Sequence, residues 1–451
     1  MSDNEEKYDL YTEKIKEKPS VKYKKTIRAI KHVFLVILFG IVAGVSFAAV
    51  FYAGMRYGDK EVQEKRDEVT IPTDAYPDEE STQETESNTD ELSTQEEITT
   101  LETGTEGMSE STFENATQGA SKEETQPNED KVKENYFKEY YAFVKDTVNE
   151  AKKSIITVTA VYEAADPIVN IIEKQDDYAG LVIADNSVEL LILTSYSPIM
   201  NANQVKVTFS DGTSANAQIL DGNKTTDLAV IGVRLNNISA STKKTVEIAT
   251  LGNSYMIGLG DALIALGDLY SANYSMDLGI ATNVTVTKYD TDASYRLIYT
   301  SMNTPADSNG FVFNIKGEVV GVITHKYDSD ANMIVYGISD LKELIQSLSN
   351  AKDIAYLGVI GQDITQEVAD RIGVGKGVYV TTVEEDSPAF KAGIQNGDII
   401  TAIGTRNITT MTDVKRALCE YSYGSMVNVT VQRMGKSGYV TLEFNVTLGV
   451  K

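Results

Sequence analysis

The chain has 451 residues, which is enough for two or three domains with buried cores. Its formal net charge of −25 excludes a nucleic-acid partner, because phosphate binding needs clusters of Lys and Arg that this chain lacks outside its first 31 residues. The single cysteine, Cys419, excludes an intrachain disulfide framework and a thiolate metal site, and we expect no metal or other cofactor.

A membrane anchor is predicted close to the start of the chain. Residues 33–53 carry no charge, and at ~1.5 Å per residue they can cross a hydrocarbon core of ~30 Å. A basic segment, residues 1–32, precedes this run and an acidic one follows it, so the positive-inside rule places the first segment in the cytoplasm and the rest outside. A cleaved signal peptide is the alternative, but the long apolar run favours an uncleaved anchor over residues 33–55.

Residues 56–131 are rich in Glu, Asp, Ser and Thr, and the most polar part is "DEESTQETESNTDELSTQEE". Such a segment has too few apolar side chains to offset the entropy lost on ordering. We therefore predict a disordered acidic linker between the membrane and the folded part. An acidic interaction tail is the alternative interpretation.

The pattern changes over residues 132–351. A helix is predicted over residues 135–154, and short β-branched runs follow, among them "IITVTAVY", "VELLILTS", "LAVIGVRL", "DALIALG", "GFVFN" and "EVVGVIT". Many short strands at this spacing are typical of antiparallel barrels or a sandwich. Residues 339–351 read as a helix that closes this unit, and residues 352–451 as a small α+β module around a helix at 411–421.

Several motifs occur in the order found in a known family. They are "TTDLAVIGV", "LIYTSMNTPADSNGFVFNIKGEVVGVIT", "YLGV" and "GVYVTTVEEDSPAFKAGIQNGDIITAIG". From about residue 150 to 449 the chain resembles the HtrA-like (DegP/DegS-type) serine proteases. The resemblance implies a mainly β fold, in which a chymotrypsin-like double β-barrel over residues 132–351 is followed by a PDZ domain over residues 352–451.

The resemblance also implies a catalytic triad, of which one member is missing. In the family a His takes the proton of the nucleophilic Ser, and an Asp orients the His. The Asp falls on Asp227 and the Ser on Ser308, whereas the His position falls on Ser197. A serine hydroxyl cannot accept a proton near neutral pH as an imidazole with a pKa of ~6.5 does.

The loop before the nucleophile departs from the family as well. The family has "GNSGGP" where this chain has "ADSNGF". The Cβ of Ala306 penalises the left-handed backbone open to glycine, and Asp307 adds a negative charge where an oxyanion would develop. Together with the missing His, these changes predict a pseudoprotease.

The alternative is a substitute base, with which the protein would retain proteolytic activity. A hairpin about Lys316 and Gly317 would put residue 324 or 325 opposite Ser308, with Cβ atoms ~5 Å apart. His325 could then act on Ser308, which would make the protein a weak or conditional serine endopeptidase. The competing interpretation is a strand-end histidine that lacks Asp227 as an orienting partner, in which case Asp227 bonds to local backbone and to Ser197.

The last module keeps the features of a peptide-binding domain. In PDZ domains a peptide C-terminus adds as a strand, and backbone N–H groups of one loop hold its carboxylate. The resemblance implies the following peptide-site residues: Tyr356, Leu357, Gly358, Val359, Val414 and Leu418. The alternative is a PDZ fold that only packs on the barrels.

Taken together, these observations predict a membrane-anchored, extracytoplasmic pseudoprotease of the cell envelope. Its PDZ domain would bind peptide or protein C-termini in a regulatory or quality-control role. The resemblance offers two assemblies, a homotrimer and a hetero-oligomer with active relatives.

Overall fold

The computed structural model describes residues 65–75, 129–166, 170–303, 305–327 and 332–450. The predicted anchor, residues 33–55, lies outside these residues. Among the helices in the described ranges, none is long and apolar enough to cross a bilayer.

The first barrel is a closed sheet with the strand order β1-β2-β3-β6-β5-β4. Its strands are β1 (Ile155–Asp166), β2 (Asn170–Asp185), β3 (Glu189–Ser195), β4 (Gln204–Thr208), β5 (Ser214–Asn223) and β6 (Leu228–Arg234). β-Branched and Leu side chains fill its interior, among them Ile156, Val158, Ile192, Val207 and Ile231. The short helix α3 (Tyr196–Met200) lies between β3 and β4, and η3 (Leu235–Asn237) and α4 (Thr242–Thr245) follow β6.

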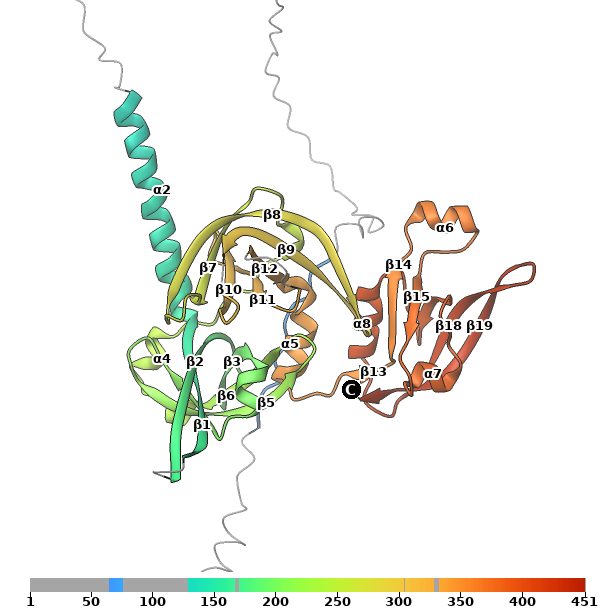
Figure 1. Ribbon diagram of the computed structural model, residues 1–451, viewed down its shortest axis with the longest axis horizontal. Helices are drawn as coiled ribbons and strands as arrows, with labels where there is room; N and C mark the ends of the chain where they lie inside the picture. The colour runs from blue at the N-terminus through green and yellow to red at the C-terminus, as the bar shows by residue number, and fades with distance from the viewer. Residues whose placement is uncertain (1–64, 76–128, 167–169, 304, 328–331, 451) are drawn as a thin grey trace, which may run out of the picture. The chain divides into compact units, whose positions relative to one another are not determined.

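The second barrel repeats this design with the order β10-β11-β12-β9-β8-β7 (Figure 1). Its strands are β7 (Ala262–Asp268), β8 (Ser275–Asp290), β9 (Ala293–Asn303), β10 (Asn309–Asn314), β11 (Val319–Thr324) and β12 (Asn332–Gly337). The 3-10 helix η4 (Ser254–Met256) precedes this barrel, and η5 (Ile338–Asp340) and α5 (Lys342–Ser349) follow it.

A single core joins the two barrels. It contains Leu191 and Leu193 of β3 together with Phe311 and Phe313 of β10. Strands that bury both faces read as unbroken apolar runs, which is why "ELLIL" and "GFVF" show little alternation. This core holds β10, and with it the Ser308 loop, against the first barrel.

Helix α2 (Glu129–Ala151) leads into the first barrel through η2 (Lys152–Ser154). Val144 and Ala151 belong to the shared core of the barrels, whereas Tyr136, Phe137 and Tyr141 are exposed. The helix therefore packs on the barrels through the part nearest its C-terminus.

The α+β module contains a six-stranded group with the order β14-β15-β16-β18-β19, to which β17 adds beside β16. Its elements are β13 (Ala355–Tyr356), β14 (Val359–Asp363), α6 (Gln366–Ile372), β15 (Val378–Val383), α7 (Pro388–Ala392), β16 (Ile399–Ile403), β17 (Arg406–Asn407), α8 (Met411–Cys419), β18 (Met426–Gly435), β19 (Gly438–Thr447) and β20 (Gly449–Val450). A capping box of Thr410 and Asp413 starts α8 and satisfies its first N–H groups.

The predicted linker, residues 56–131, is wrong for two of its parts. Residues 65–75 are packed on the folded part, because Val69 and Ile71 belong to the shared core. Their backbone is satisfied by side-chain amides, since Val69 N–H donates to Asn350 Oδ1 (2.9 Å) and Ile71 N–H to Gln346 Oε1 (2.8 Å). Helix α2 also begins at Glu129, inside the range predicted as linker. Two apolar residues in the sequence "DEVTIPTD" were enough to anchor a segment that composition alone predicts as unfolded.

Candidate functional site

A cavity of about 900 Å³ opens where the two barrels meet. Its lining includes Asp227 from the first barrel and Ser308 and His325 from the second. Tyr196 and Pro198, the neighbours of Ser197, line it too. The structure therefore brings the sequence-predicted residues of the protease-like part to one place.

Asp227 is hydrogen-bonded within its own barrel through Oδ1 and its backbone carbonyl. Its Oδ1 accepts the backbone N–H of Ser197 (2.8 Å) and the hydroxyl of Ser197 (2.5 Å), and its carbonyl accepts the N–H of Tyr196 (3.0 Å). The residue has a positive φ of 58°, a conformation that Asp tolerates better than most side chains. Ser197 thus occupies the place next to the carboxylate that an imidazole would need.

Ser308 is buried, with 4% of its surface exposed, and both of its donors point at one carbonyl of its own loop. Its hydroxyl donates to Pro305 O (2.7 Å), and its backbone N–H is directed at the same oxygen (3.1 Å). An oxyanion hole needs that N–H aimed at the developing charge. The loop of Pro305 to Ser308 therefore presents neither a free hydroxyl proton nor the nucleophile's amide to the cavity.

His325 lies directly beside Ser308. Its Nε2 is 3.3 Å from Ser308 Oγ and 2.7 Å from Ser308 O. A carbonyl oxygen only accepts hydrogen bonds, so the shorter contact requires a proton on Nε2. In this arrangement Nε2 has no lone pair with which to take the hydroxyl proton.

Asp307 comes directly before Ser308, and Asp268 lies nearby on β7; the cavity lining also includes Lys224 and Lys326. Burial raises the pKa of Asp268, a backbone hydrogen bond from Ala272 opposes this, and the charges of Asp307 and Asp177 raise the pKa further. Asp268 lies opposite Asn309 in the pairing of β7 and β10. A negative charge on Asp307, the residue before Ser308, disfavours a further negative charge there, such as that of an oxyanion.

Asn309 replaces a family glycine and serves a structural purpose. Its Oδ1 accepts the N–H of Ala179 in β2 (2.5 Å), which ties the Ser308 loop to the first barrel.

No group of three or more His, Cys, Asp or Glu side chains in the described ranges is arranged to hold a metal ion.

The second candidate site is the loop of the α+β module that sequence reasoning assigned to a peptide carboxylate. The N–H groups of Leu357, Gly358 and Val359 do converge on one carboxylate, and it belongs to Asp292. Gly358 has a φ of +91°, which allows the loop to turn its amides toward one point. Sequence reasoning missed Asp292, because nothing in "YDTDASY" indicates a contact with a loop 65 residues further along.

The remaining predicted residues of this site are internal. Val414 and Leu418 on α8 belong to the buried core of the module. Tyr356 pairs with Gly449 in the two-stranded sheet of β13 and β20. A cavity of about 160 Å³ beside them is lined by Leu418 and Tyr356 of this module and by Asp292 and Tyr295 of the second barrel.

Two protein families match the chain. Residues 179–322 match the family described as a trypsin-like peptidase domain, and residues 355–448 match the family described as a PDZ domain. The first range covers Asp227 and Ser308, and the second covers the loop around Gly358. These matches define a trypsin-like double barrel followed by a PDZ domain.

Curated relatives of this chain are named as serine proteases. The chain is 27% identical over 282 residues to "Probable periplasmic serine endoprotease DegP-like" of Brucella suis biovar 1, covering 60% of this chain and 52% of the relative. It is 28% identical over 284 residues to "Serine protease Do-like HtrB" of Bacillus subtilis, covering 57% and 60%. The chain spans about half the length of the first of these. The chain is similar to HtrA/DegP-like serine proteases, and its trypsin-like peptidase domain is followed by a C-terminal PDZ domain.

A solved structure shows the same fold. The chain superposes on "HtrA-type protease AlgW with decapeptide" with a TM-score of 0.50 and 19% identity, covering 68% of this chain and 98% of that one. The predicted mainly β architecture of two barrels and a PDZ domain is thereby confirmed.

Proposed function

We propose that this protein is a membrane-anchored, extracytoplasmic pseudoprotease whose PDZ domain binds peptide or protein C-termini. The observation that carries the first part is the placement of Ser197, which donates two hydrogen bonds to Asp227 where the family has its base. The hydrogen bonds of the Ser308 hydroxyl and N–H, both to Pro305 O, support it.

The anchoring is supported by the sequence of the first part of the chain. The uncharged run of residues 33–53 follows a basic segment and precedes an acidic one, and this order supports a globular part outside the cytoplasm. The names of the relatives include periplasmic proteases. A regulatory or quality-control role, as a homotrimer or in a hetero-oligomer with active relatives, is part of the same proposal.

The alternative is a weak or conditional serine endopeptidase, and one distance favours it. Ser308 Oγ and His325 Nε2 are 3.3 Å apart, which is close to the reach of general-base catalysis. Movement of the Nε2 proton to the other ring nitrogen would give His325 a lone pair toward Ser308. The residue would still lack the bond to Asp227 that orients the family's base.

The test is reaction of the full chain, in detergent, with a serine-directed fluorophosphonate probe, together with casein cleavage. Wild-type protein and the variants Ser308→Ala and His325→Ala are compared, and a folded state is verified by circular dichroism. We expect neither labelling nor cleavage above the level of Ser308→Ala. Labelling that disappears in Ser308→Ala would overturn the pseudoprotease proposal, and its loss in His325→Ala would identify the base.

A further inference from the structure

The carboxylate-binding loop of the PDZ domain is filled by the chain itself. Asp292 lies in the two-residue turn between β8 and β9 of the second barrel. Its carboxylate accepts four hydrogen bonds: Leu357 N–H at 2.8 Å, Gly358 N–H at 2.8 and 2.9 Å, and Val359 N–H at 2.9 Å. Every N–H group that would hold a peptide carboxylate therefore points at Asp292.

Asp292 also reproduces the backbone contact of a bound peptide. A peptide in a PDZ groove forms main-chain hydrogen bonds with the neighbouring strand as well as placing its carboxylate in the loop. The N–H of Asp292 donates to Val359 O at 2.7 Å, at the start of β14. A side-chain carboxylate on a short stem, next to its own N–H, offers the same two groups as the last residue of a chain.

The contact is closed to solvent. Asp292 is 8% exposed, and Leu357 and Val359 are 0% exposed. The neighbouring Thr291 donates its hydroxyl to Glu384 Oε1 (2.8 Å), at the other side of the loop. An incoming carboxylate can reach the three N–H groups only after this turn has moved away.

The helix that forms the second wall of a PDZ groove is held by the same hairpin. Ser294 at the start of β9 lies 3.3 Å from the hydroxyl of Thr412 on α8. Tyr295 lies under the ammonium group of Lys415, 5.7 Å from the ring centroid. Tyr289 of β8 packs against the buried core of the PDZ domain. The hairpin thus lies along both β14 and α8, where a peptide strand would lie.

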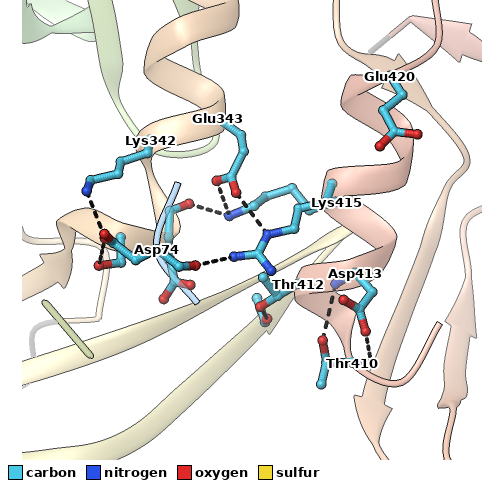
Figure 2. A network of polar contacts seen from close by, with 12 residues as sticks. Asp74, Lys342, Glu343, Thr410, Thr412, Asp413, Lys415 and Glu420 are labelled. Carbon is cyan, nitrogen blue, oxygen red and sulfur yellow. Dashed lines mark hydrogen bonds and ion pairs between the residues drawn. The ribbon is translucent and has the colours of Figure 1, made fainter. Parts of the chain in front are cut away.

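A second set of contacts fixes α8 against the barrels (Figure 2). Glu343 of α5 pairs with Arg416 (3.0 Å) and with Lys415 (3.6 Å), and Lys415 also donates to Asp340 O. Arg416 donates to Asp74 O at 2.8 Å, in the segment of residues 65–75. These contacts keep the hairpin and the groove at the short distance that a built-in ligand requires.

We infer that the β8–β9 hairpin is a built-in ligand of the PDZ domain, and that a free C-terminal carboxylate binds only by displacing Asp292. This inference rests on the proposed binding of C-termini by the PDZ domain. Its consequence is that the wild-type protein binds such peptides more weakly than its groove allows. The apparent affinity for a peptide is the affinity of the open groove multiplied by the fraction of molecules in which the groove is open. A tethered ligand keeps this fraction small, because its effective concentration is about millimolar.

The first arm of the test follows the loop itself in the full chain. Hydrogen exchange of residues 355–361 is measured by mass spectrometry in wild-type protein, Asp292→Ala and Asp292→Asn. Glu385→Gln, at an exposed carboxylate of the PDZ domain, is the charge-matched control. We expect exchange at the loop to be about 10- to 100-fold faster in both Asp292 variants and unchanged in the control. Equal exchange in wild type and the Asp292 variants would overturn the inference.

The second arm measures binding. The probe is a pool of dansylated octapeptides of random sequence with an apolar last residue and a free carboxylate, and the same pool with an amidated end is the comparison. We expect Asp292→Ala to bind the free-carboxylate pool about 10- to 100-fold more tightly than wild type does, and the amidated pool no better.

The two arms separate the two proposals. Equal binding of the free-carboxylate pool by wild type and Asp292→Ala would overturn the built-in ligand while leaving peptide binding intact. Fast exchange in Asp292→Ala without any peptide binding would support the built-in ligand and overturn the proposed capture of C-termini. Circular dichroism and the thermal midpoint of each variant establish that the proteins compared are folded.

Discussion

Ser197 donates both its backbone N–H and its hydroxyl to Oδ1 of Asp227. In a working triad this carboxylate would accept a bond from imidazole, and here the serine satisfies it locally. The arrangement is a stable polar cluster that needs no histidine. It shows how Asp227 is satisfied beside a cavity without an imidazole.

Replacing the hydroxyl should therefore weaken the fold slightly. We expect Ser197→Ala to lower the free energy of unfolding by about 1 kcal/mol, because Asp227 keeps the Ser197 N–H but loses the hydroxyl. Urea unfolding followed by circular dichroism measures this change. Ser422→Ala, at an exposed serine, is the control, and equal stability of the two variants would show that the hydroxyl bond contributes nothing.

Replacement of Gly358 should destabilise the PDZ domain, because Ser387 lies against it in space. A Cβ on Gly358 would lie 2.2 Å from Ser387 Cβ, at a φ of +91°. We expect Gly358→Ala to cost about 3 kcal/mol, from backbone strain and overpacking together. Gly373→Ala is the matched control, because it has a φ of +72° with nothing within 4 Å of the added Cβ, and it should cost only about 1 kcal/mol. Thermal unfolding measures the loss of stability in both variants. Gly373→Ala shows the effect of backbone strain alone, and Gly358→Ala shows strain together with the collision with Ser387.

Two ion pairs of the PDZ domain should contribute very unequally to its stability. Arg433 contacts Asp398 through two nitrogens at 2.6 and 2.7 Å, and the side chain of Asp398 is 1% exposed. Removing the arginine leaves a buried carboxylate without its counter-charge, so Arg433→Met should cost about 3 kcal/mol. Arg406→Met removes the exposed pair with Glu420 and should cost less than about 1 kcal/mol. Similar urea midpoints for the two variants would contradict this ranking.

The contact of Glu343 with α8 predicts a dependence of stability on pH. Burial acts to raise the pKa of Glu343, but the charge of Lys415, hydrogen bonding to backbone and the hydrogen bond from Arg416 outweigh it and lower the pKa below its ordinary value of 4.5. A lowered pKa contributes stability that is present above the ordinary value and is lost as the pH falls through the folded value. Glu343→Gln should therefore lose less stability than wild type between about pH 6 and about pH 3. Urea unfolding across this range measures it, and parallel curves for the two proteins would contradict the prediction.

The strand pattern predicted antiparallel barrels or a sandwich, because the strands are short apolar runs between turn residues, and the family resemblance selected two barrels. The pattern did not predict β12, since "NMIVYG" follows a polar loop and is short, nor helices α6 and α7, which are held by local caps at Thr365 and Ser387. Caps of this kind stabilise helices too short to show a periodic pattern. The packing of Val69 and Ile71 escaped prediction because the side-chain amides that satisfy this segment lie far away in the sequence.

The residues of the candidate sites were also predicted only in part. Hairpin geometry placed residue 324 or 325 opposite Ser308, and His325 lies 3.3 Å from its hydroxyl. The family resemblance, and not spacing, indicated the loop of Leu357 to Val359, and its occupant comes from another domain. Asp292 could not be found from spacing, because a contact between domains follows from how two finished surfaces dock.

Restoring the histidine alone should not restore proteolysis. Ser197→His would put an imidazole beside Asp227, yet the N–H of Ser308 would still donate to Pro305 O and Asp307 would still oppose an oxyanion. We expect casein cleavage by this variant to stay near the level of its Ser308→Ala counterpart. Adding Ala306→Gly, Asp307→Asn, Asn309→Gly and Phe311→Pro should raise the rate at least about 100-fold, the usual effect of one oxyanion-hole donor. If Ser197→His cleaved casein as fast as the combined variant, the loop around Ser308 would be competent and the missing base would be the sole defect.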